Sequence, residues 1–413
     1  MALGAALIWE VRTTGNTNNG GAFRDVLPGT SVDYSQQNAA QKNIADGACP
    51  LGGLTVTTAA GGMTTDLIGN LWQVTAGVNF SPGFYEVVAV PTANTFTLDR
   101  TPCPAGIGAG GTGSIGGALD SPLKAITNAV SGNKIFVKLG VYNAGATWTY
   151  TNVNVLLRGY DASRAIRPTG ANRPTIHMVT FQLALKSLCM LENFIIDGSN
   201  LNLVSIPIAA DMCIVQNCKI TNTAVAGTAC CISGVTSNSI LVFDCELIGT
   251  AGATSIGVKM GEESNYIAFN YFHNLTTGIT GTDFSSVIAH NTFSTEGTGI
   301  SFSSGSGIVA SIMFNNFYNQ SSRHVYFGDK GCLIYGNTLD TAVGAAIEQV
   351  NVDNCTIVEN NDFWNNGISL VNLVLDQNNI GLDPLWVNPG VDFDFQALSP
   401  NKDQALGIRL GVG

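Results

Sequence analysis

The side chains best suited to chemistry form an acidic file with regular spacing. Glu262, Asp283, Asp329 and Asp353 each stand eight residues before a repeated Asn position, and Gly307 occupies the same place in one further copy. Two carboxylates about 5 Å apart are typical of a retaining glycoside hydrolase. The same oxygens would suit a hard cation such as Ca²⁺. Asp also begins turns by bonding its own backbone, and this turn interpretation is favoured over the other two.

A second candidate group lies around Val325, which is expected to point inward. Arg323 and His324 flank it and are therefore expected to face solvent. A histidine close to carboxylates can act as a base, but a solvated surface pair is the favoured interpretation.

An arginine-rich stretch and three tryptophans could contact a sugar. Arg164, Arg167 and Arg173 lie in one segment that would clamp an anionic sugar, although a loop making contacts between subunits or coils is favoured. The aromatic platforms available for stacking are Trp148, Trp364 and Trp386.

These residues must be positioned by a repeated element of six residues. Copies such as IAFNYF, IAHNTF and IMFNNF begin with Ile, Val or Met and end with Ile, Leu or Phe. Successive copies are 21 to 27 residues apart. The fourth position of the eight copies is occupied by Asn193, Cys218, Cys245, Asn270, Asn291, Asn315, Asn337 and Asn361.

A repeat of this length, with two short apolar segments in most periods and no helical pattern, predicts a β-solenoid. Coils stacked about 4.8 Å apart would bury one another's apolar faces. Stacked amides would form a ladder, and Asn would tolerate the left-handed backbone that the corner can require. An aliphatic file and an aromatic-rich file (Phe272, Phe293, Phe317, Leu339 and Phe363) are expected beside it.

Composition agrees with a β-protein and excludes some partners. Of the 413 residues, 45% are hydrophobic and 11% charged, with 48 Gly. A net charge of -11 with dispersed Lys and Arg argues against nucleic-acid binding. No apolar run is long enough to predict a membrane span, and the segment MALGAALIW lacks the basic region of a signal peptide.

The ten cysteines show no metal-binding spacing. They are expected to be free core thiols made in a reducing cytoplasm, with a bridge between Cys49 and Cys103 left open. No cofactor is expected, and Ca²⁺ is the one open alternative.

Residues 1–114 lack the repeat and are expected to form an arm and a small antiparallel β-subdomain. A short helix is predicted next, with Asp120 or Ser121 as N-cap, Pro122 at its first position, and an apolar face that would cover the first coil. The repeats over 115–380 are expected to form the solenoid, and 381–413 a closing segment.

The Asn ladder and the stacked files resemble those of right-handed parallel β-helices, the pectate-lyase-like superfamily. The resemblance implies an all-β fold, a right-handed parallel β-helix with an N-terminal β-subdomain and a capping helix. Polygalacturonase motifs are missing, and the Arg and Asp placements of pectate lyases cannot be matched to this sequence.

The N-terminal order WEVRTTG (9–15), NNGG (18–21) and YSQQ (34–37) resembles β-helical proteins of tailed-phage virions. This resemblance implies a structural virion protein (capsid decoration, or a tail or spike component), more plausibly without catalysis. It also implies a homotrimer that contacts other virion proteins through 1–114. The alternatives are a tailspike that binds or cleaves a cell-surface glycan, and a secreted polysaccharide-processing β-helix enzyme or adhesin.

Overall fold

The chain is an all-β protein whose main body is a right-handed parallel β-helix, as the resemblance implied and in agreement with the β-solenoid that the repeats predicted. The structure is a computed structural model. It describes residues 3–4, 6–24, 36–163, 168–178, 180–198, 203–223, 229–235, 237, 239–250, 255–260, 264–281, 285–302, 310–328, 331–350, 356–373, 378–388 and 392–395. The chain divides into two compact units. The first comprises 1–142, 149–168 and 172–174, and the second comprises 143–148, 169–171 and 175–413.

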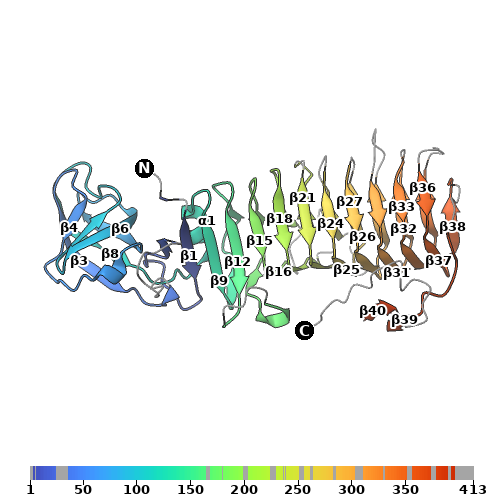
Figure 1. Cartoon of the computed structure of the whole chain (residues 1–413), viewed down its shortest axis with the longest axis horizontal. Coiled ribbons are helices and arrows are strands. Elements are labelled where there is room, and N and C mark those ends of the chain that lie inside the picture. The colour runs from blue at the N-terminus through green and yellow to red at the C-terminus, as the bar shows by residue number, and fades with distance from the viewer. Residues whose placement is uncertain are drawn as a thin grey trace. The chain divides into compact units, whose positions relative to one another are not determined.

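The first unit contains a closed antiparallel barrel (Figure 1). In barrel order the strands are β3 (Lys42–Cys49), β4 (Thr55–Thr57), β7 (Thr95–Leu98), β6 (Gly83–Thr92), β5 (Leu71–Val78) and β8 (Gly108–Ile115). Trp72 fills the barrel core and meets Phe80 and Phe96 edge to face at 5.8 and 5.2 Å between ring centroids. The predicted antiparallel subdomain is thus a closed barrel, an architecture that leaves no exposed sheet edge.

The rest of the first unit contains four paired strands, three of them parallel, with a helix against them. β1 (Leu7–Val11) and β12 (Leu156–Tyr160) both pair in parallel with β9 (Lys134–Lys138), and β2 (Ala22–Arg24) pairs antiparallel with β1. The apolar start of the chain is a buried strand, since every residue of β1 is buried. Helix α1 (Pro122–Asn128) has Pro122 at its start and packs against β1 and β9.

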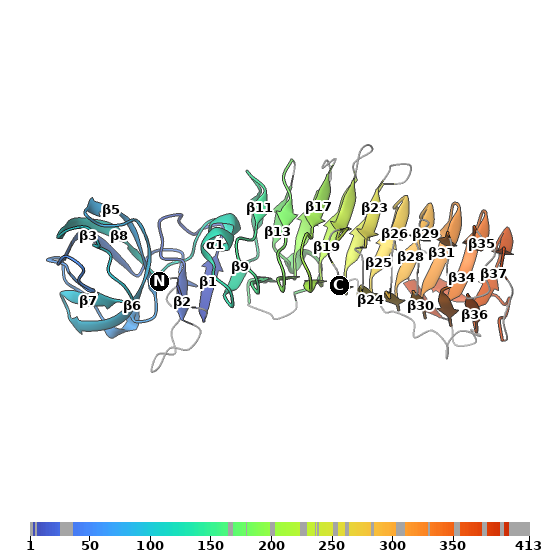
Figure 2. The same cartoon turned by 90° about the horizontal axis from the view of Figure 1, so that it is seen from above.

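The second unit stacks short parallel strands into three sheets (Figures 1 and 2). The first sheet contains β15 (Met190–Glu192), β18 (Cys213–Gln216), β21 (Ile240–Phe243), β24 (Tyr266–Ala268), β27 (Val287–Ala289), β30 (Ser311–Met313), β33 (Leu333–Tyr335) and β36 (Ile357–Glu359). The second contains β13 (Thr175–His177), β16 (Ile195–Asp197), β19 (Lys219–Thr221), β22 (Glu246–Ile248), β25 (Tyr271–His273), β28 (Thr292–Ser294), β31 (Asn316–Gln320), β34 (Thr338–Ala342) and β37 (Asp362–Trp364). The third contains β17 (Val204–Pro207), β20 (Cys230–Ser233), β23 (Ile256–Lys259), β26 (Thr277–Gly281), β29 (Thr298–Phe302), β32 (Arg323–Phe327), β35 (Ala345–Gln349) and β38 (Ile368–Val371).

Shorter elements complete the described chain. They are η2 (Thr65–Leu67), β10 (Val141–Asn143), β11 (Trp148–Thr149), η3 (Gly170–Asn172), β14 (Leu183–Ala184) and the antiparallel pair β39 (Trp386–Asn388) and β40 (Asp392–Phe395). No helix among the described residues is long and apolar enough to cross a membrane.

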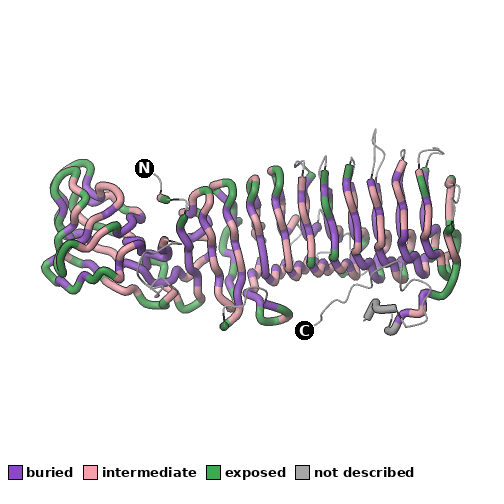
Figure 3. Tube along the Cα trace, in the orientation of Figure 1, coloured by how far each residue is buried: buried purple, intermediate pink, exposed green. Residues whose placement is uncertain are grey.

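Identical positions of neighbouring coils stack inside the second unit, where the strands are largely buried (Figure 3). Phe272 lies over Phe293 at 4.8 Å between ring centroids, and Phe293 lies over Phe317 at 4.7 Å. The register continues this file from Phe317 to Leu339 and Phe363, as predicted. Such stacking buries about one large apolar side chain per coil, worth roughly 1.5–3 kcal/mol each.

The corner between the first and second sheets differs from the prediction in one respect. The left-handed residue is the one before the ladder Asn, with φ of 60° at Phe269, 56° at His290 and 56° at Phe314. The chain turns at this preceding residue, which leaves the Asn side chain inside and its backbone N–H aimed along the stack. Phe269 and His290 stack on each other at 5.0 Å, and this contact offsets part of the roughly 1–2 kcal/mol cost of a left-handed residue with a side chain.

Candidate functional site

The acidic file predicted from the sequence falls outside the described part of the chain. Glu262, Asp283, Asp329 and Asp353 all belong to connections between the third and first sheets that the structure does not describe. Their roles as turn residues, Ca²⁺ ligands or catalytic groups stay predictions. Among the described residues, no group of three or more His, Cys, Asp or Glu side chains could hold a metal ion.

The Asn file forms a hydrogen-bonded ladder inside the second unit. Asn291 Nδ2 donates to Asn315 Oδ1 at 3.1 Å and to the carbonyl of Ile267 at 2.8 Å, while the Asn291 N–H donates to the same Asn315 oxygen at 2.9 Å. Asn270, Asn315, Asn337 and Asn361 repeat these bonds. Asn379 extends the ladder by one coil beyond the predicted set, with its Oδ1 2.9 Å from the Asn361 N–H. These amides are bonded to the protein, which gives them a structural role.

At the other end of the ladder the register differs from the prediction by one residue. β15 pairs with β18 so that Glu192 lies beside Gln216, and the next residue, Asn193, therefore lies beside Asn217. Asn217 Nδ2 donates to Asn193 Oδ1 at 2.8 Å, and Asn193 is itself left-handed, with φ 67°. Asn193 thus occupies the turning position. Cys218 and Cys245 lie in the ladder file, are buried, and continue it with thiols in place of amides.

His324 is buried, so the prediction that it faces solvent was wrong. Its Nδ1 lies 2.6 Å from Gln320 Oε1 and its Nε2 lies 2.9 Å from Asn366 Oδ1. Burial lowers the pKa of His324 to about 3, so the ring is neutral near pH 7. His324 and Val325 are both buried because strands of the third sheet depart from strict alternation there, and β26 and β29 show the same pattern. Arg323 lies on the surface beside Glu348, as expected.

The remaining sequence candidates do not assemble into a site. Arg164 and Arg167 lie outside the described residues, and Arg173 is buried. Trp148 is buried too, with 2% of its surface exposed, and offers no platform. The nine cysteines that the structure describes are buried thiols, and Cys49 and Cys103 therefore form no disulfide.

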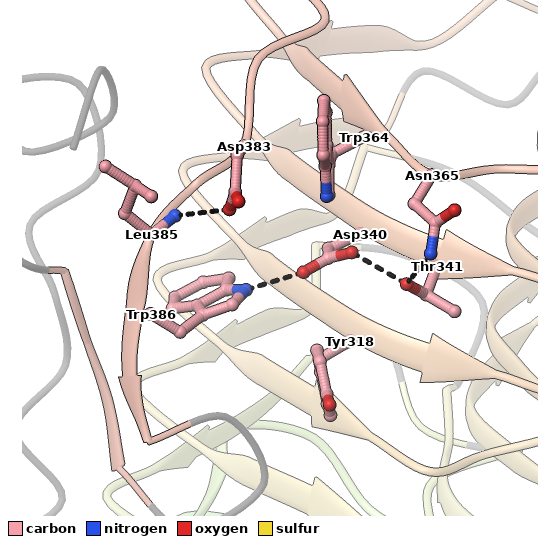
Figure 4. A pocket seen from close by; sticks show the side chains of 8 residues that line it. All are labelled: Tyr318, Asp340, Thr341, Trp364, Asn365, Asp383, Leu385 and Trp386. Atoms are coloured by element: carbon pink, nitrogen blue, oxygen red, sulfur yellow. Dashed lines mark hydrogen bonds between the residues drawn. The ribbon is translucent and has the colours of Figure 1, made fainter.

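A pocket on the second sheet does bring the other two tryptophans together (Figure 4). We call it the Trp364–Trp386 pocket. It has a volume of about 320 Å³, near the lower end of the range for small-molecule sites. Its lining residues are Tyr318, Asp340, Thr341, Trp364, Asn365, Asp383, Leu385 and Trp386.

Two parts of the chain build this pocket. Tyr318, Asp340 and Trp364 are register neighbours on β31, β34 and β37, each directly after a member of the Phe and Leu file. Because the file residues point inward, the residues after them point outward on adjacent coils. Asp383, Leu385 and Trp386 come from the segment that follows the last coil and face this sheet (Figure 4).

Hydrogen bonds fix the carboxylates of the pocket. Trp386 Nε1 donates to Asp340 Oδ2 at 2.7 Å, and Thr341 Oγ1 donates to Asp340 Oδ1 at 2.8 Å. Leu385 N–H donates to Asp383 Oδ1 at 2.9 Å. Both oxygens of Asp340 therefore have protein donors, and this carboxylate holds the Trp386 ring in place.

Electrostatics in the pocket are governed by these two aspartates. Burial raises the pKa of the Asp340 carboxyl, the donors Thr341 and Trp386 lower it in part, and the charge of Asp383 raises it again. None of the residues lining the pocket is Lys, Arg or His. The pocket thus combines aromatic rings, a fixed buried carboxyl and an exposed acidic side chain.

The repeat predicts the positions of those pocket residues that lie on the second sheet. Tyr318, Asp340 and Trp364 each follow the sixth position of a repeat copy, so extending the alignment by one residue would have placed them together. Asp383 and Trp386 lie outside the repeats, and no period relates them to Asp340.

A second polar cluster lies on the same sheet, at Lys219, Glu246 and His273. Lys219 Nζ is 3.0 Å from Glu246 Oε2, and His273 Nε2 is 3.2 Å from Glu246 Oε1. Burial raises the pKa of Glu246, but the bonds from His273 and Lys219 outweigh it and bring the pKa below its usual value. The groups are partly exposed, and such ion pairs on a sheet surface contribute little to stability.

Comparisons with known proteins bear on the fold. No protein-family model and no curated protein matches the chain. Among solved structures it is similar to the periplasmic alginate epimerase AlgG, with 11% identity and a TM-score of 0.32 over 61% of this chain and 76% of the epimerase. The GH87 alpha-1,3-glucanase of Streptomyces thermodiastaticus shows 11% identity and a TM-score of 0.35 over 83% of this chain and 84% of that one.

A phage protein is among the similar structures. The Dettilon tailspike protein gp208 shows 13% identity and a TM-score of 0.39, over 62% of this chain and 61% of the tailspike. This chain therefore spans less than two thirds of the tailspike's length. Likenesses this distant carry no information about function.

Proposed function

We propose that this protein is a glycan-binding β-helical protein of a phage virion, of the tailspike type. The observation that carries the proposal is the Trp364–Trp386 pocket, where two tryptophans and two aspartates meet on the second sheet. Small-molecule sites combine apolar and aromatic walls with a few oriented polar groups, and this pocket has that composition.

The aromatic rings and the carboxyl groups of the pocket each match a chemical feature of a sugar. An aromatic face provides a flat apolar surface for the C–H groups of a pyranose ring. Aspartate oxygens accept hydrogen bonds from hydroxyl groups, and these charge-assisted bonds are stronger than neutral ones. Trp364 is 36% exposed and is therefore the principal stacking surface.

The arrangement favours binding over cleavage. Asp340 already accepts hydrogen bonds at both oxygens, one of them from Trp386. A catalytic acid must give its proton to the substrate, whereas this carboxyl is committed to positioning an aromatic ring. We therefore assign the pocket to recognition.

Titration of the full chain with oligosaccharides, followed by tryptophan fluorescence and calorimetry, tests the proposal. Trp364→Ala is expected to weaken glycan binding about tenfold or more, because one aromatic contact contributes about 1 kcal/mol or more beyond its buried area. Phe269→Ala is the matched control, since Phe269 is exposed to 43% and lies outside the pocket. Equal affinity of Trp364→Ala and the unaltered protein would contradict the proposal.

A purely structural role in the virion is the second candidate. It is supported by the closed N-terminal barrel, which has its own core and suits attachment to another virion protein. In this role the chain would be a homotrimer docked through 1–114. Mass spectrometry of purified virions should find the protein, and light scattering should give three times the mass of 43.1 kDa. Absence of the protein from virions would rule out this role and also the virion placement in the first proposal, whereas glycan binding would be unaffected.

A further inference from the structure

We infer that the Trp364–Trp386 pocket selects sugar units without negative charge and rejects uronic acids. The inference rests on the proposed function, because it specifies the class of glycan that the same pocket binds. It starts from the charges that line the cavity.

Among the residues that the structure describes, the lining contains two carboxyl groups and no cation. Asp383 is exposed, and Asp340 is buried to 95% of its surface at the back of the pocket. None of the eight lining residues carries a positive charge that could pair with the carboxylate of a uronic acid. Recognition of carboxylates in proteins relies on such partners, arginine above all.

A negative sugar would also meet repulsion at close range. The pocket holds about 320 Å³, so any group inside it lies near both carboxyl groups. Like charges at such distances repel strongly wherever water is partly excluded. The net charge of -11 adds a weaker, long-range contribution of the same sign.

An uncharged sugar would form hydrogen bonds with the pocket carboxylates and would not be repelled by them. Its hydroxyl groups are donors, and a carboxylate is an acceptor with several lone pairs. Asp383 uses Oδ1 to accept from the Leu385 N–H, and the exposed carboxylate has capacity for further donors. Trp364 is 36% exposed and provides a ring whose stacking does not require charge, whereas Trp386 is 6% exposed and forms a wall of the pocket.

The test uses the full chain on an array of neutral oligosaccharides and of uronic-acid oligomers, with affinities measured by calorimetry for matched pairs. Oligogalactose against oligogalacturonate and oligomannose against oligomannuronate are suitable pairs. We expect the neutral member to bind at least about tenfold more tightly at low salt, with a smaller ratio at high salt because screening weakens repulsion.

The variant Asp383→Asn identifies the source of the selectivity. It keeps the size of the side chain and removes the exposed charge, so the ratio between neutral and acidic sugars should fall severalfold. Glu359→Gln, a surface substitution on β36 outside the pocket, should leave the ratio unchanged.

The outcomes separate this inference from the proposed function. Uronic-acid oligomers that bind as tightly as neutral ones, or a ratio unchanged in Asp383→Asn, would overturn the inference and leave glycan binding intact. Failure of the unaltered protein to bind any sugar on the array would overturn both.

Discussion

At the residue scale, two neighbouring residues divide the two roles that the sequence interpretation gave to the ladder Asn alone. Asn291 lies inside the ladder and bonds along the stack, whereas His290, directly before it, takes the left-handed conformation. The repeat shows that each coil has a corner. Because Asn suits both amide bonding along the stack and a left-handed backbone, the sequence interpretation assigned both roles to the same position. Asn193 shows the consequence, because it turns the chain without occupying the ladder file.

Glu296 is a residue whose burial has a measurable cost. It is 1% exposed, and neither of its carboxyl oxygens has a hydrogen-bond partner in the described part of the chain. Burial raises the pKa of Glu296 well above its usual value of 4.5. The folded protein therefore keeps this proton at a pH where the unfolded chain has released it.

Stability should consequently fall as pH rises above about 4.5, by about 1.4 kcal/mol per pH unit until the folded-state pKa is reached. We predict that Glu296→Gln removes this loss, so its gain in the unfolding free energy of the second unit is larger at pH 8 than at pH 4. Urea unfolding at both pH values measures the difference, with Glu359→Gln as the surface control. An equal effect at both pH values would show that Glu296 ionises normally.

At the element scale, the place of a residue within the repeat decides whether its side chain points into the core or out of it. Tyr318, Asp340 and Trp364 point outward only because the file residues before them point inward. The pocket becomes a cavity when the segment containing Asp383 and Trp386 lies against this sheet. The bond from Trp386 Nε1 to Asp340 is one of the polar contacts that join the two, and the bond from the Leu382 N–H to Asp362 Oδ1 is another.

Trp386→Phe keeps an aromatic ring and removes that donor. We expect faster amide hydrogen exchange over 381–388 and a loss of about 1 kcal/mol in the free energy that holds this segment to the sheet. Exchange in the coils before it should stay as in the unaltered protein. Trp364→Phe is the control, and the prediction is wrong if both variants exchange alike.

At the scale of the whole molecule, the chain is two compact units with separate cores. The barrel core is centred on Trp72, and the solenoid core on the stack of Phe272, Phe293 and Phe317. Units with their own buried surface can unfold separately, so a single unfolding free energy does not describe such a chain.

We therefore predict two transitions in differential scanning calorimetry. Trp72→Ala should lower the temperature of one transition and Phe293→Ala that of the other, because each removes about 3–5 kcal/mol from its own core. Both variants shifting a single common transition would mean that the units unfold together.

The sequence by itself determined the solenoid, its coil spacing and its stacked files, including Phe293 over Phe317 and Asn291 over Asn315. The physical reason is that parallel coils place residues one period apart in direct contact, so a local repeat encodes a lateral neighbour. Only the tertiary structure decided that His324 turns inward and that Trp386 meets Asp340. The inward position of His324 follows a pair of consecutive inward residues that recurs in β26, β29 and β32, whereas the sequence interpretation assumed strict alternation. The position of Trp386 depends on where a non-repeating segment packs, and no period in the sequence displays that.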